Sequence, residues 1–222
     1  TLHPGEPVAV LWESRDREWV YLITALLRGW VKKEFVATYP DKKGLEEYKK
    51  QPKLVVIDRT VPFYEGVDGK EIGTWKMGTV LHASLQEEGD FYRIERPVRG
   101  EAGEVSFSPA YVRRKKVRKE FLPLTGKTIL TQAFKLYGAT YGWGGLKGGW
   151  DCSSFLRDIF LTMGVGLPRN SGPQSRLGKV QTKDLQSLLD GTPPAQTFVK
   201  LKGHVMLYLG KVNGRHYVIH AT

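Results

Sequence analysis

Cys152 is the single cysteine among the 222 residues, and its neighbours favour a reactive thiol over a buried one. Asp151 before it is a good helix N-cap, and Phe155, Ile159 and Met163 after it recur at helical spacing. A helix N-terminus carries partial positive charge, which favours a thiolate, and its free N–H groups can stabilise an oxyanion. The sequence therefore places a candidate nucleophile in the first turn of a helix. The alternative is a small apolar filler behind an ordinary cap.

A thiolate nucleophile needs a general base, which is usually a histidine held by a third polar group. The candidates are His3, His82, His204, His216 and His220. The last three lie in a segment that reads as a β-hairpin around Val212-Asn213-Gly214. A two-residue Asn-Gly loop would put His204 and His220 on opposite faces, whereas a three-residue loop would put both on one face, with His216 nearer the turn. A catalytic pair therefore predicts the three-residue loop, or another register in which paired residue numbers add to an even sum.

Helices and a glycine-rich loop surround the candidate nucleophile. The spacing of residues 125–137 predicts a helix capped by Thr125 and ended by Gly138, and the helix after Cys152 is expected to end at Gly164. Residues 142–149 hold five glycines and predict an irregular loop that lets a substrate backbone approach the sulfur. The letters TGKT at 125–128 resemble part of a phosphate-binding loop, but the upstream glycine of such a loop is absent, so we reject that function.

The first half of the chain reads as short strands separated by charged or glycine-containing breaks. One set of strands lies between residues 5 and 37 and a second between residues 54 and 112. Each set ends with an aromatic-led strand, a glycine and a short strand, so we interpret them as two small SH3-like barrels, residues 1–50 and 51–118. In segment 19–23 both alternating sets of side chains are apolar, and we expect burial on both faces.

Composition fits a globular chain of two or three small domains, with 41 % apolar and 26 % charged residues. No apolar stretch is long enough to span a membrane, and one cysteine excludes an intrachain disulfide. The net charge of +11 favours an anionic partner, which could be nucleic acid, anionic lipid or an anionic cell-wall polymer, although solubility alone could also explain it. The basic run 113–119 is either an anion-binding patch or a solvated linker, and we favour the linker.

Four motifs in order resemble the NlpC (NlpC/p-sixty) family of cell-wall peptidases. They are Tyr141 with the following Gly-Trp-Gly-Gly, Asp151-Cys152-Ser153 at a helix start, Gly203-His204-Val205 before a strand, and Val218-Ile219-His220. The resemblance covers about residues 125–222, and two upstream barrels match a common arrangement in the family. It implies a multidomain chain in which two all-β SH3-like barrels precede an α+β papain-like cysteine peptidase domain, residues 119–222.

The resemblance also implies roles for single residues. Cys152 matches the nucleophile, His204 the general base and His220 the orienting third residue of a triad that needs no metal or cofactor. The positions that match substrate-binding residues are Tyr141, Asp151, Ser153 and Ser171. The family's usual reaction is cleavage of peptidoglycan stem peptides between γ-D-glutamate and a diamino acid such as meso-diaminopimelate.

Two features near the ends of the sequence qualify the resemblance. Glu6 resembles an acidic residue that holds the free amine of an N-terminal L-Ala in relatives with two barrels, but Leu27-Arg28 stands where such relatives have a tyrosine. The family's domain usually continues past the third triad residue, whereas this sequence stops two residues after His220 and begins at Thr1 without a secretory signal. We therefore expect a segment of a longer protein or a domain without its closing strands.

The expected partners are stem peptides or muropeptides, with an anionic wall polymer as a further candidate and no nucleic acid. The expected location is the bacterial cell envelope, with cytoplasmic fragment recycling as the alternative. Two other functions stay open: an amidase or acyltransferase that uses the same triad, and a non-catalytic wall-binding protein.

Overall fold

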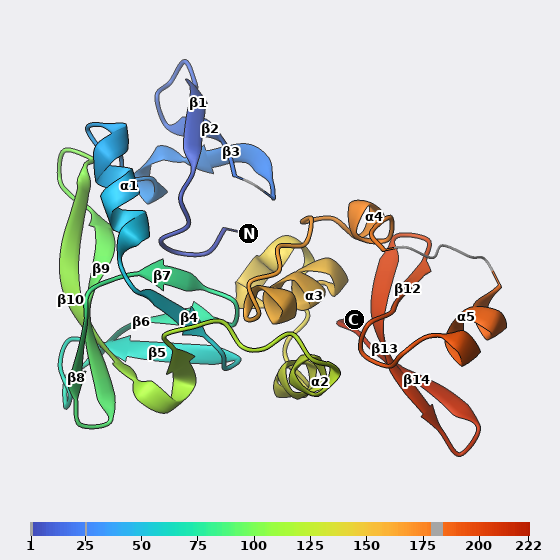
Figure 1. Cartoon of the computed structure of the whole chain (residues 1–222). Coiled ribbons are helices and arrows are strands. Elements are labelled where there is room, and N and C mark those ends of the chain that lie inside the picture. Colours follow the sequence, from blue (N-terminus) through green and yellow to red (C-terminus); the bar gives the residue numbers. More distant parts are fainter. Residues whose placement is uncertain (1, 25, 179–183) are drawn as a thin grey trace. The chain divides into compact units, whose positions relative to one another are not determined.

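The computed structural model describes residues 2–24, 26–178 and 184–222 (Figure 1). The chain forms two compact units, Leu2–Phe121 and Leu122–Thr222. Within the described ranges, none of the helices is both long and apolar enough to cross a membrane. The fold is mixed α/β with several small antiparallel sheets.

The first unit begins with an antiparallel sheet of β1 (Ala9–Glu13), β2 (Trp19–Ile23) and β3 (Arg28–Lys32). Val20 and Leu22 of β2 are buried in a small core with Val36, which follows the 3-10 turn η1 (Lys33–Phe35). The expectation that segment 19–23 is buried on both faces is wrong. Trp19 and Ile23 are exposed, because this small sheet packs its core on one face only.

Helix α1 (Lys42–Lys50) follows, and the strand pattern read from the sequence does not predict it. Asp41 caps it by accepting a hydrogen bond from the Gly44 N–H at 2.9 Å. The hydroxyl of Tyr48, the buried residue of the helix, donates to the Gly5 carbonyl. This helix lies inside the range expected for the first barrel, so that range is not purely strand.

The rest of the first unit consists of two sheets around one core. The larger sheet has the order β6 (Glu71–Lys76), β5 (Thr60–Tyr64), β10 (Val105–Arg113), β9 (Phe91–Arg99), β8 (Leu85–Glu88), and the smaller has the order β11 (Val117–Arg118), β4 (Lys53–Val56), β7 (Val80–His82). Apolar residues from both sheets form a single buried cluster. The amino-terminal region is SH3-like, and its division into two closed barrels stays a prediction.

The basic run 113–119 is part of this fold, so the expectation of a linker is wrong, while most of its charged side chains are solvated as expected. Its residues complete β10, form the 3-10 turn η2 (Arg114–Lys116) and pair as β11 with β4. Arg114 and Lys119 both form ion pairs with Glu87, and Lys116 pairs with Asp58. Carboxylates thus neutralise part of the run, which reduces its value as an anion-binding patch.

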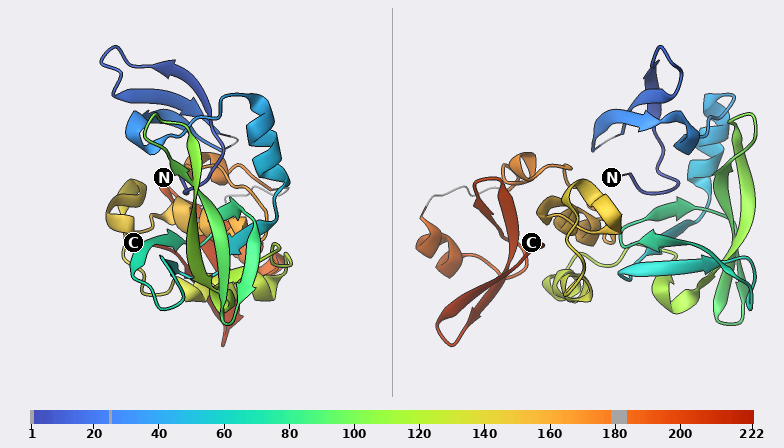
Figure 2. Two further views of the ribbon diagram at one scale, coloured as in Figure 1. Left: turned by 90° about the vertical axis from the view of Figure 1, so that its left-hand side faces the viewer. Right: turned by 180° about the vertical axis from the view of Figure 1, so that it is seen from behind.

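The second unit packs helices against one three-stranded sheet (Figures 1 and 2). Its helices are α2 (Gly126–Lys135), η3 (Trp143–Gly148), α3 (Cys152–Leu161), α4 (Ser171–Gln174) and α5 (Leu185–Gly191), and its sheet has the order β12 (Phe198–Leu201), β13 (His204–Val212), β14 (Arg215–Ile219). Helix α3 packs against α2 and against β13. The tip of the β13–β14 hairpin extends away from α2 and α3.

Local sequence signals account for the helix boundaries in this unit. Thr125 caps α2 by accepting a hydrogen bond from the Thr128 N–H at 3.1 Å, and Gly138 adopts a positive φ of 70° just beyond the helix. Gly164, with a φ of 75°, lies beyond the end of α3 in the same way. Both helices therefore lie where the sequence predicted them.

Candidate active site

Cys152 is the first residue of α3, directly after the N-cap Asp151. The cap is reciprocal, because the Asp151 carboxylate accepts from the Ser154 N–H at 2.8 Å and the Asp151 N–H donates to the Ser154 hydroxyl at 2.9 Å. Within the described part of the chain, the N–H groups of Cys152 and Ser153 have no acceptor, as expected in a first helical turn. Cys152 is 8 % exposed, so it is buried but not sealed off. The helix start therefore offers a thiol beside free backbone donors.

The glycine-rich loop before α3 is irregular, as the sequence predicted. Gly144 and Gly145 have φ values of 65° and 88°, which side chains with a Cβ rarely adopt. A Cβ on Gly149 would lie 2.6 Å from the Thr140 carbonyl oxygen, so the two ends of the loop can meet only with glycine there. The Gly144 N–H donates to the Asp151 carboxylate at 3.0 Å, which holds the loop against the start of α3.

Arg169 pairs with Asp151, although no motif of the sequence points to Arg169. Its guanidinium donates to both carboxylate oxygens of Asp151, at 2.6 and 3.2 Å, and to the Ser153 hydroxyl at 2.9 Å. Burial by itself would raise the pKa of Asp151, but the hydrogen bonds from Arg169 and from the Ser154 amide outweigh it and hold that pKa well below its usual value. The residues on both sides of Cys152 are therefore held by one cation. A buried acidic N-cap needs such a partner, which is the signal that could have identified Arg169.

The segment that carries Arg169 also reaches the start of β13. Two residues later, the Ser171 hydroxyl donates to the Gly203 carbonyl at 3.5 Å, directly before His204. In addition, the buried Gln174 amide donates to the Ser153 carbonyl at 2.9 Å. Because two residues span at most about 7 Å, one short segment holds the first residues of α3 and of β13 near each other. This brings the surroundings of Cys152 and His204 together.

His204, the first residue of β13, and His220, directly after the end of β14, form a pair. His204 Nε2 lies 3.0 Å from His220 Nδ1, and the two rings meet edge to face with centroids 4.8 Å apart. Burial lowers the pKa of His204, and the neighbouring His220 lowers it further. With Nε2 engaged by His220, the Nδ1 atom of His204 remains for a thiol or a substrate.

The hairpin obtains its register near the histidines from a β-bulge that the sequence does not predict. The expected three-residue loop is wrong. The turn consists of Asn213 and Gly214, both with positive φ, and strand partners near it add to an odd sum, as in Val212 opposite Arg215. A β-bulge between Tyr208 and Gly210 then shifts the register, so that Leu207 lies opposite Ile219 and the sum becomes even. The bulge therefore produces the even register that a histidine pair requires.

His216, the third histidine of the hairpin, has other partners. Its Nδ1 lies 2.8 Å from the Tyr208 hydroxyl, and its Nε2 lies 3.4 Å from a carboxylate oxygen of Asp190. Lys211 also pairs with Asp190, at 2.9 Å. These contacts link the hairpin to α5, and they distinguish His216 from the His204–His220 pair.

The remaining predicted site residues divide between the two units. Tyr141 is half exposed and forms an isolated bridge with Trp150, next to the N-cap. Ser153 accepts a hydrogen bond from Arg169, and Ser171 donates one to the Gly203 carbonyl. Glu6 lies in the first unit, where its carboxylate accepts from the His3 N–H at 3.2 Å. Its role with substrate stays a prediction. In the described ranges, no group of three or more histidine, cysteine or acidic residues could hold a metal ion.

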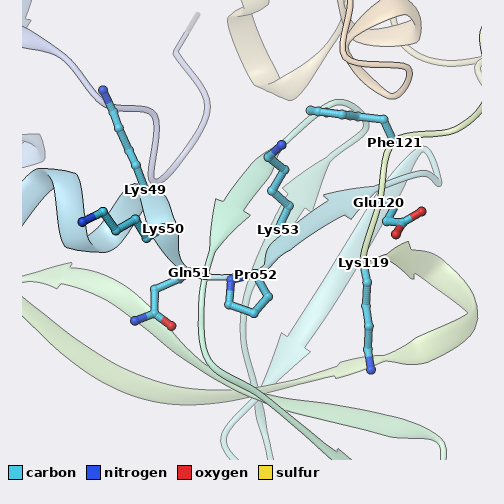
Figure 3. Close-up of a pocket in the computed structure, with 8 residues that line it drawn as sticks. All are labelled: Lys49, Lys50, Gln51, Pro52, Lys53, Lys119, Glu120 and Phe121. Carbon is cyan, nitrogen blue, oxygen red and sulfur yellow. The ribbon is translucent and has the colours of Figure 1, made fainter.

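A lysine-rich hollow lies in the first unit. It has a volume of about 460 Å³ and is lined by Lys49, Lys50, Lys53, Lys119 and other residues around the start of β4. Figure 3 shows the ammonium groups of Lys49, Lys53 and Lys119 pointing in different directions. They do not converge on one ligand, so the hollow adds positive potential without forming a defined anion site.

Known proteins resemble both units of the chain. Residues 138–222 match the NlpC/P60 family, and residues 1–32 match the SH3 domain of the SH3b1 type. A γ-D-glutamyl-L-lysine dipeptidyl-peptidase of Bacillus subtilis (strain 168) is 28 % identical over 202 residues, which cover 85 % of this chain and 66 % of that protein. A protein of the same name from Bacillus cereus (strain ATCC 10987 / NRS 248) is 38 % identical over 96 residues, 41 % of this chain and 26 % of that protein. The chain thus spans only part of these relatives.

Two solved structures have the same overall fold. An NlpC/P60 endopeptidase from Photobacterium damselae subsp. piscicida aligns with a TM-score of 0.71 at 23 % identity, over 96 % of this chain and 50 % of that chain. An NlpC/P60 family protein from Bacillus cereus ATCC 10987 aligns with a TM-score of 0.66 at 22 % identity, over 96 % of this chain and 73 % of that chain.

Proposed function

The chain carries an NlpC/P60 family domain at residues 138–222 behind an SH3b1-type region, and we propose that it hydrolyses peptidoglycan stem peptides as a cysteine peptidase. The observation that supports this most directly is the 3.0 Å contact between His204 Nε2 and His220 Nδ1. His204 begins β13, the strand that packs against the helix starting at Cys152. The names of the two Bacillus relatives support the same substrate class. We assign the scissile bond to the amide between γ-D-glutamate and an L-diamino acid, either L-lysine or meso-diaminopimelate.

The proposed chemistry is acyl transfer to sulfur. The Cys152 thiolate attacks the γ-glutamyl carbonyl carbon, forming a C–S bond, and the free N–H groups at the start of α3 stabilise the oxyanion. The imidazolium of His204 then protonates the leaving amine as the C–N bond breaks. Water, deprotonated by His204, hydrolyses the thioester and releases the γ-glutamyl carboxylate. Each step needs only residues of this chain and water.

His220 has an orienting role in this mechanism. His204 donates its Nε2–H to Nδ1 of His220, which fixes the tautomer and ring position of His204 while it carries the proton. Tyr141, Ser153 and Ser171 line the approach to the sulfur and bind the stem peptide, and Asp151 with Arg169 positions the start of the helix. Glu6 is the proposed partner of a free N-terminal amine on the substrate.

The test is mass spectrometry of products from synthetic tri- and tetrapeptide stems with lysine or diaminopimelate, each with a free or blocked N-terminus. Cleavage after γ-D-glutamate is expected, and Cys152→Ala should abolish it while the circular dichroism spectrum is kept. His204→Ala should remove essentially all activity and His220→Ala should leave a measurable fraction, because His220 orients rather than reacts. His216→Ala is the matched control on the same hairpin and should stay close to the parent.

Other outcomes would change the assignment. Cleavage by Cys152→Ala at the parent rate would overturn the mechanism. Transfer to added acyl esters without stem-peptide cleavage would favour an acyltransferase that uses the same residues. Binding to cell walls without turnover of any stem would favour a non-catalytic wall-binding protein. Fractionation of cells would locate the protein in the envelope, as we propose, or in the cytoplasm, as a recycling role requires.

A further inference from the structure

Helix α3 carries a buried ion pair that the proposed mechanism does not use. Arg157 and Asp158, in the second half of the helix, are 3 % and 1 % exposed. The guanidinium of Arg157 donates from Nε and Nη2 to one carboxylate oxygen of Asp158, Oδ1, at 3.0 and 2.9 Å. The other oxygen, Oδ2, accepts a hydrogen bond from the indole Nε1–H of Trp150 at 2.9 Å. The ion pair therefore directs one oxygen of a buried carboxylate at the residue that precedes the N-cap Asp151.

This network fixes an orientation rather than simply filling the core. A buried ion pair is by itself weak evidence for stability, because apolar residues of similar size often stabilise a core as well or better. Trp150 is 3 % exposed, and its buried indole N–H requires an acceptor. The hydrogen bond to Asp158 supplies that acceptor and sets the direction of the indole ring, which an apolar contact would not do.

Trp150 is the anchor of the glycine-rich loop. Within residues 139–150, all of which the structure describes, it is the only buried residue apart from Gly142 and Gly149. Residues 143–148 bury no side chain, and their backbone includes several non-helical conformations. A loop with so few buried contacts does not fix its own position. Its placement on α3 therefore depends on the residues at its ends, and Trp150 is the one whose side chain reaches into the helix.

The backbone of Trp150 transmits this anchoring to Tyr141. The Trp150 N–H donates to the Thr140 carbonyl at 3.1 Å, and the Gly142 N–H donates to the Trp150 carbonyl at 3.1 Å. These two hydrogen bonds flank Tyr141, which forms the isolated bridge with Trp150. Tyr141 is 43 % exposed, so burial does not hold its side chain in place. The position of Tyr141 relative to Cys152 therefore depends on Trp150.

We propose that Trp150 and Asp158 are positioning residues of the peptidase site, which act through Tyr141 on the binding of the stem peptide. Asp158, held by Arg157, fixes the indole, and Trp150 fixes segment 140–142 against the start of α3. This rests on the proposed function, because Tyr141 is assigned there to substrate binding. Trp150 and Asp158 neither touch the substrate nor carry a proton in the reaction. Loss of the link should therefore raise KM more than it lowers kcat.

The test compares Trp150→Phe with Trp75→Phe in the full chain. Both substitutions keep an aromatic ring and remove the indole N–H of a residue that is 3 % exposed, but Trp75 stacks on Phe63 in the first unit. Trp150→Phe should raise KM for a stem peptide about tenfold and keep kcat within about threefold of the parent. Trp75→Phe should keep KM within about twofold. In a double-mutant cycle, Tyr141→Ala should raise KM less in the Trp150→Phe background than in the parent.

Hydrogen exchange followed by mass spectrometry reads the same link without turnover. Trp150→Phe should speed exchange in peptides that span residues 139–150 about tenfold, and Trp75→Phe should leave them unchanged. Asp158→Asn is a second variant that breaks the link from the other side. Its amide has one acceptor oxygen where the carboxylate has two, so it cannot hold both Arg157 and Trp150 in the present geometry. It should shift KM and exchange in the same direction, and it carries the test if Trp150→Phe does not fold.

Three results would overturn the proposal. The first is parental KM and parental exchange in Trp150→Phe and Asp158→Asn. The second is full additivity of Tyr141→Ala and Trp150→Phe in the cycle. The third is an equal rise of KM in Trp75→Phe, which would assign the effect to general loosening of the chain. A parent that cleaves no stem peptide would overturn the proposed function instead, and the exchange measurement would still decide whether Trp150 anchors the loop.

Discussion

Arg169 places a guanidinium against Asp151, the residue directly before the proposed nucleophile. The Asp151 and Arg169 side chains are 10 % and 13 % exposed, so each charge depends on the other for compensation. Sequence motifs point to Cys152, His204 and His220 as candidates because nucleophile, base and orienting group are distinctive residue types. Arg169 was missed because an arginine in a loop has no such signature. Only the fold shows that it lies against a residue 18 positions earlier.

Removing Arg169 should destabilise the protein and change its response to acid. Arg169→Ala leaves a largely buried carboxylate with fewer partners, at a cost of about 3 kcal/mol in the free energy of unfolding at pH 7. The folded-state pKa of Asp151 lies below its unfolded value, so its contribution to stability is present above about pH 4 and is lost as pH falls towards the folded pKa. Below about pH 4 the parent should therefore lose stability more steeply than the variant, by up to about 1.4 kcal/mol per pH unit.

Urea titrations of parent and Arg169→Ala between pH 7 and pH 2 measure this difference. Arg169→Lys is the control, because it keeps the charge and loses the two-pronged geometry, and it should fall between the two. If the free energy of unfolding fell equally steeply at acid pH in the parent and in Arg169→Ala, the role given to this ion pair would be contradicted.

The histidine pair can be tested by titrating His204 directly. Burial is the first cause of its lowered pKa and the neighbouring His220 is the second. His220→Asn keeps a polar side chain and removes the neighbouring imidazole, so the pKa of His204 should rise towards its ordinary value. NMR titration of the His204 ring in the Cys152→Ala background measures this pKa. His216→Asn should leave it unchanged, and a fall in the pKa of His204 in His220→Asn would exclude the proposed coupling.

At the level of elements, the helices of the second unit were predicted well and the hairpin only in part. Thr125 and Asp151 are side-chain caps next to periodic apolar runs, so local sequence determines where both helices begin. The bulge in β13 has no comparable local signal. It depends on Gly210, whose φ is 121° and where an added Cβ would lie 3.2 Å from the Pro194 ring. Helix α1 was missed because its mainly charged sequence lacks a wide apolar stripe, and a single buried residue, Tyr48, anchors it.

The bulge can be tested by comparing two glycines of the hairpin. Gly210→Ala adds strain at the bulge and pushes against Pro194, so it should cost about 2 kcal/mol in stability. By disturbing the register it should also lower kcat/KM for a stem peptide by about tenfold or more. Gly214→Ala is the control, because Gly214 has a φ of 76° in the turn and open space around it. It should cost about 1 kcal/mol with little change in kcat/KM. Equal losses of activity in both variants would argue against a role for the bulge in placing the histidines.

For the molecule as a whole, the sequence predicted two SH3-like barrels before a papain-like domain. Matches of residues 1–32 to an SH3 domain and of residues 138–222 to the NlpC/P60 family support the order, and the presence of two barrels stays a prediction. The sequence did not predict that the second set of strands divides into two sheets around one core, since sheet partners that lie far apart in sequence, such as β5 and β10, leave no local pattern. It also misjudged the basic run 113–119, which is folded and partly neutralised by Glu87 and Asp58.

The net charge of +11 predicts salt-dependent attachment to anionic cell walls. Raising NaCl from about 0.05 M to about 0.5 M shortens the range of electrostatic attraction and should release most of the Cys152→Ala protein from purified walls. Hydrolysis of a small soluble stem peptide by the parent should change far less, because it depends on short contacts inside the site. Co-sedimentation and peptide kinetics over the same salt series separate the two effects, and equal salt sensitivity would contradict this division.

The extra residue in β13 also divides the hairpin into two stretches that can vary independently. Between Leu209 and the turn, the numbers of paired residues add to an odd sum. Between Leu209 and the two histidines, they add to an even sum. Adding or removing one residue from each strand at the tip would lengthen or shorten the outer stretch, while His204 and His220 would keep their alignment. Related proteins could therefore carry hairpin tips of different lengths on the same reaction centre, and a tag grafted at Asn213-Gly214 should leave the chemistry intact.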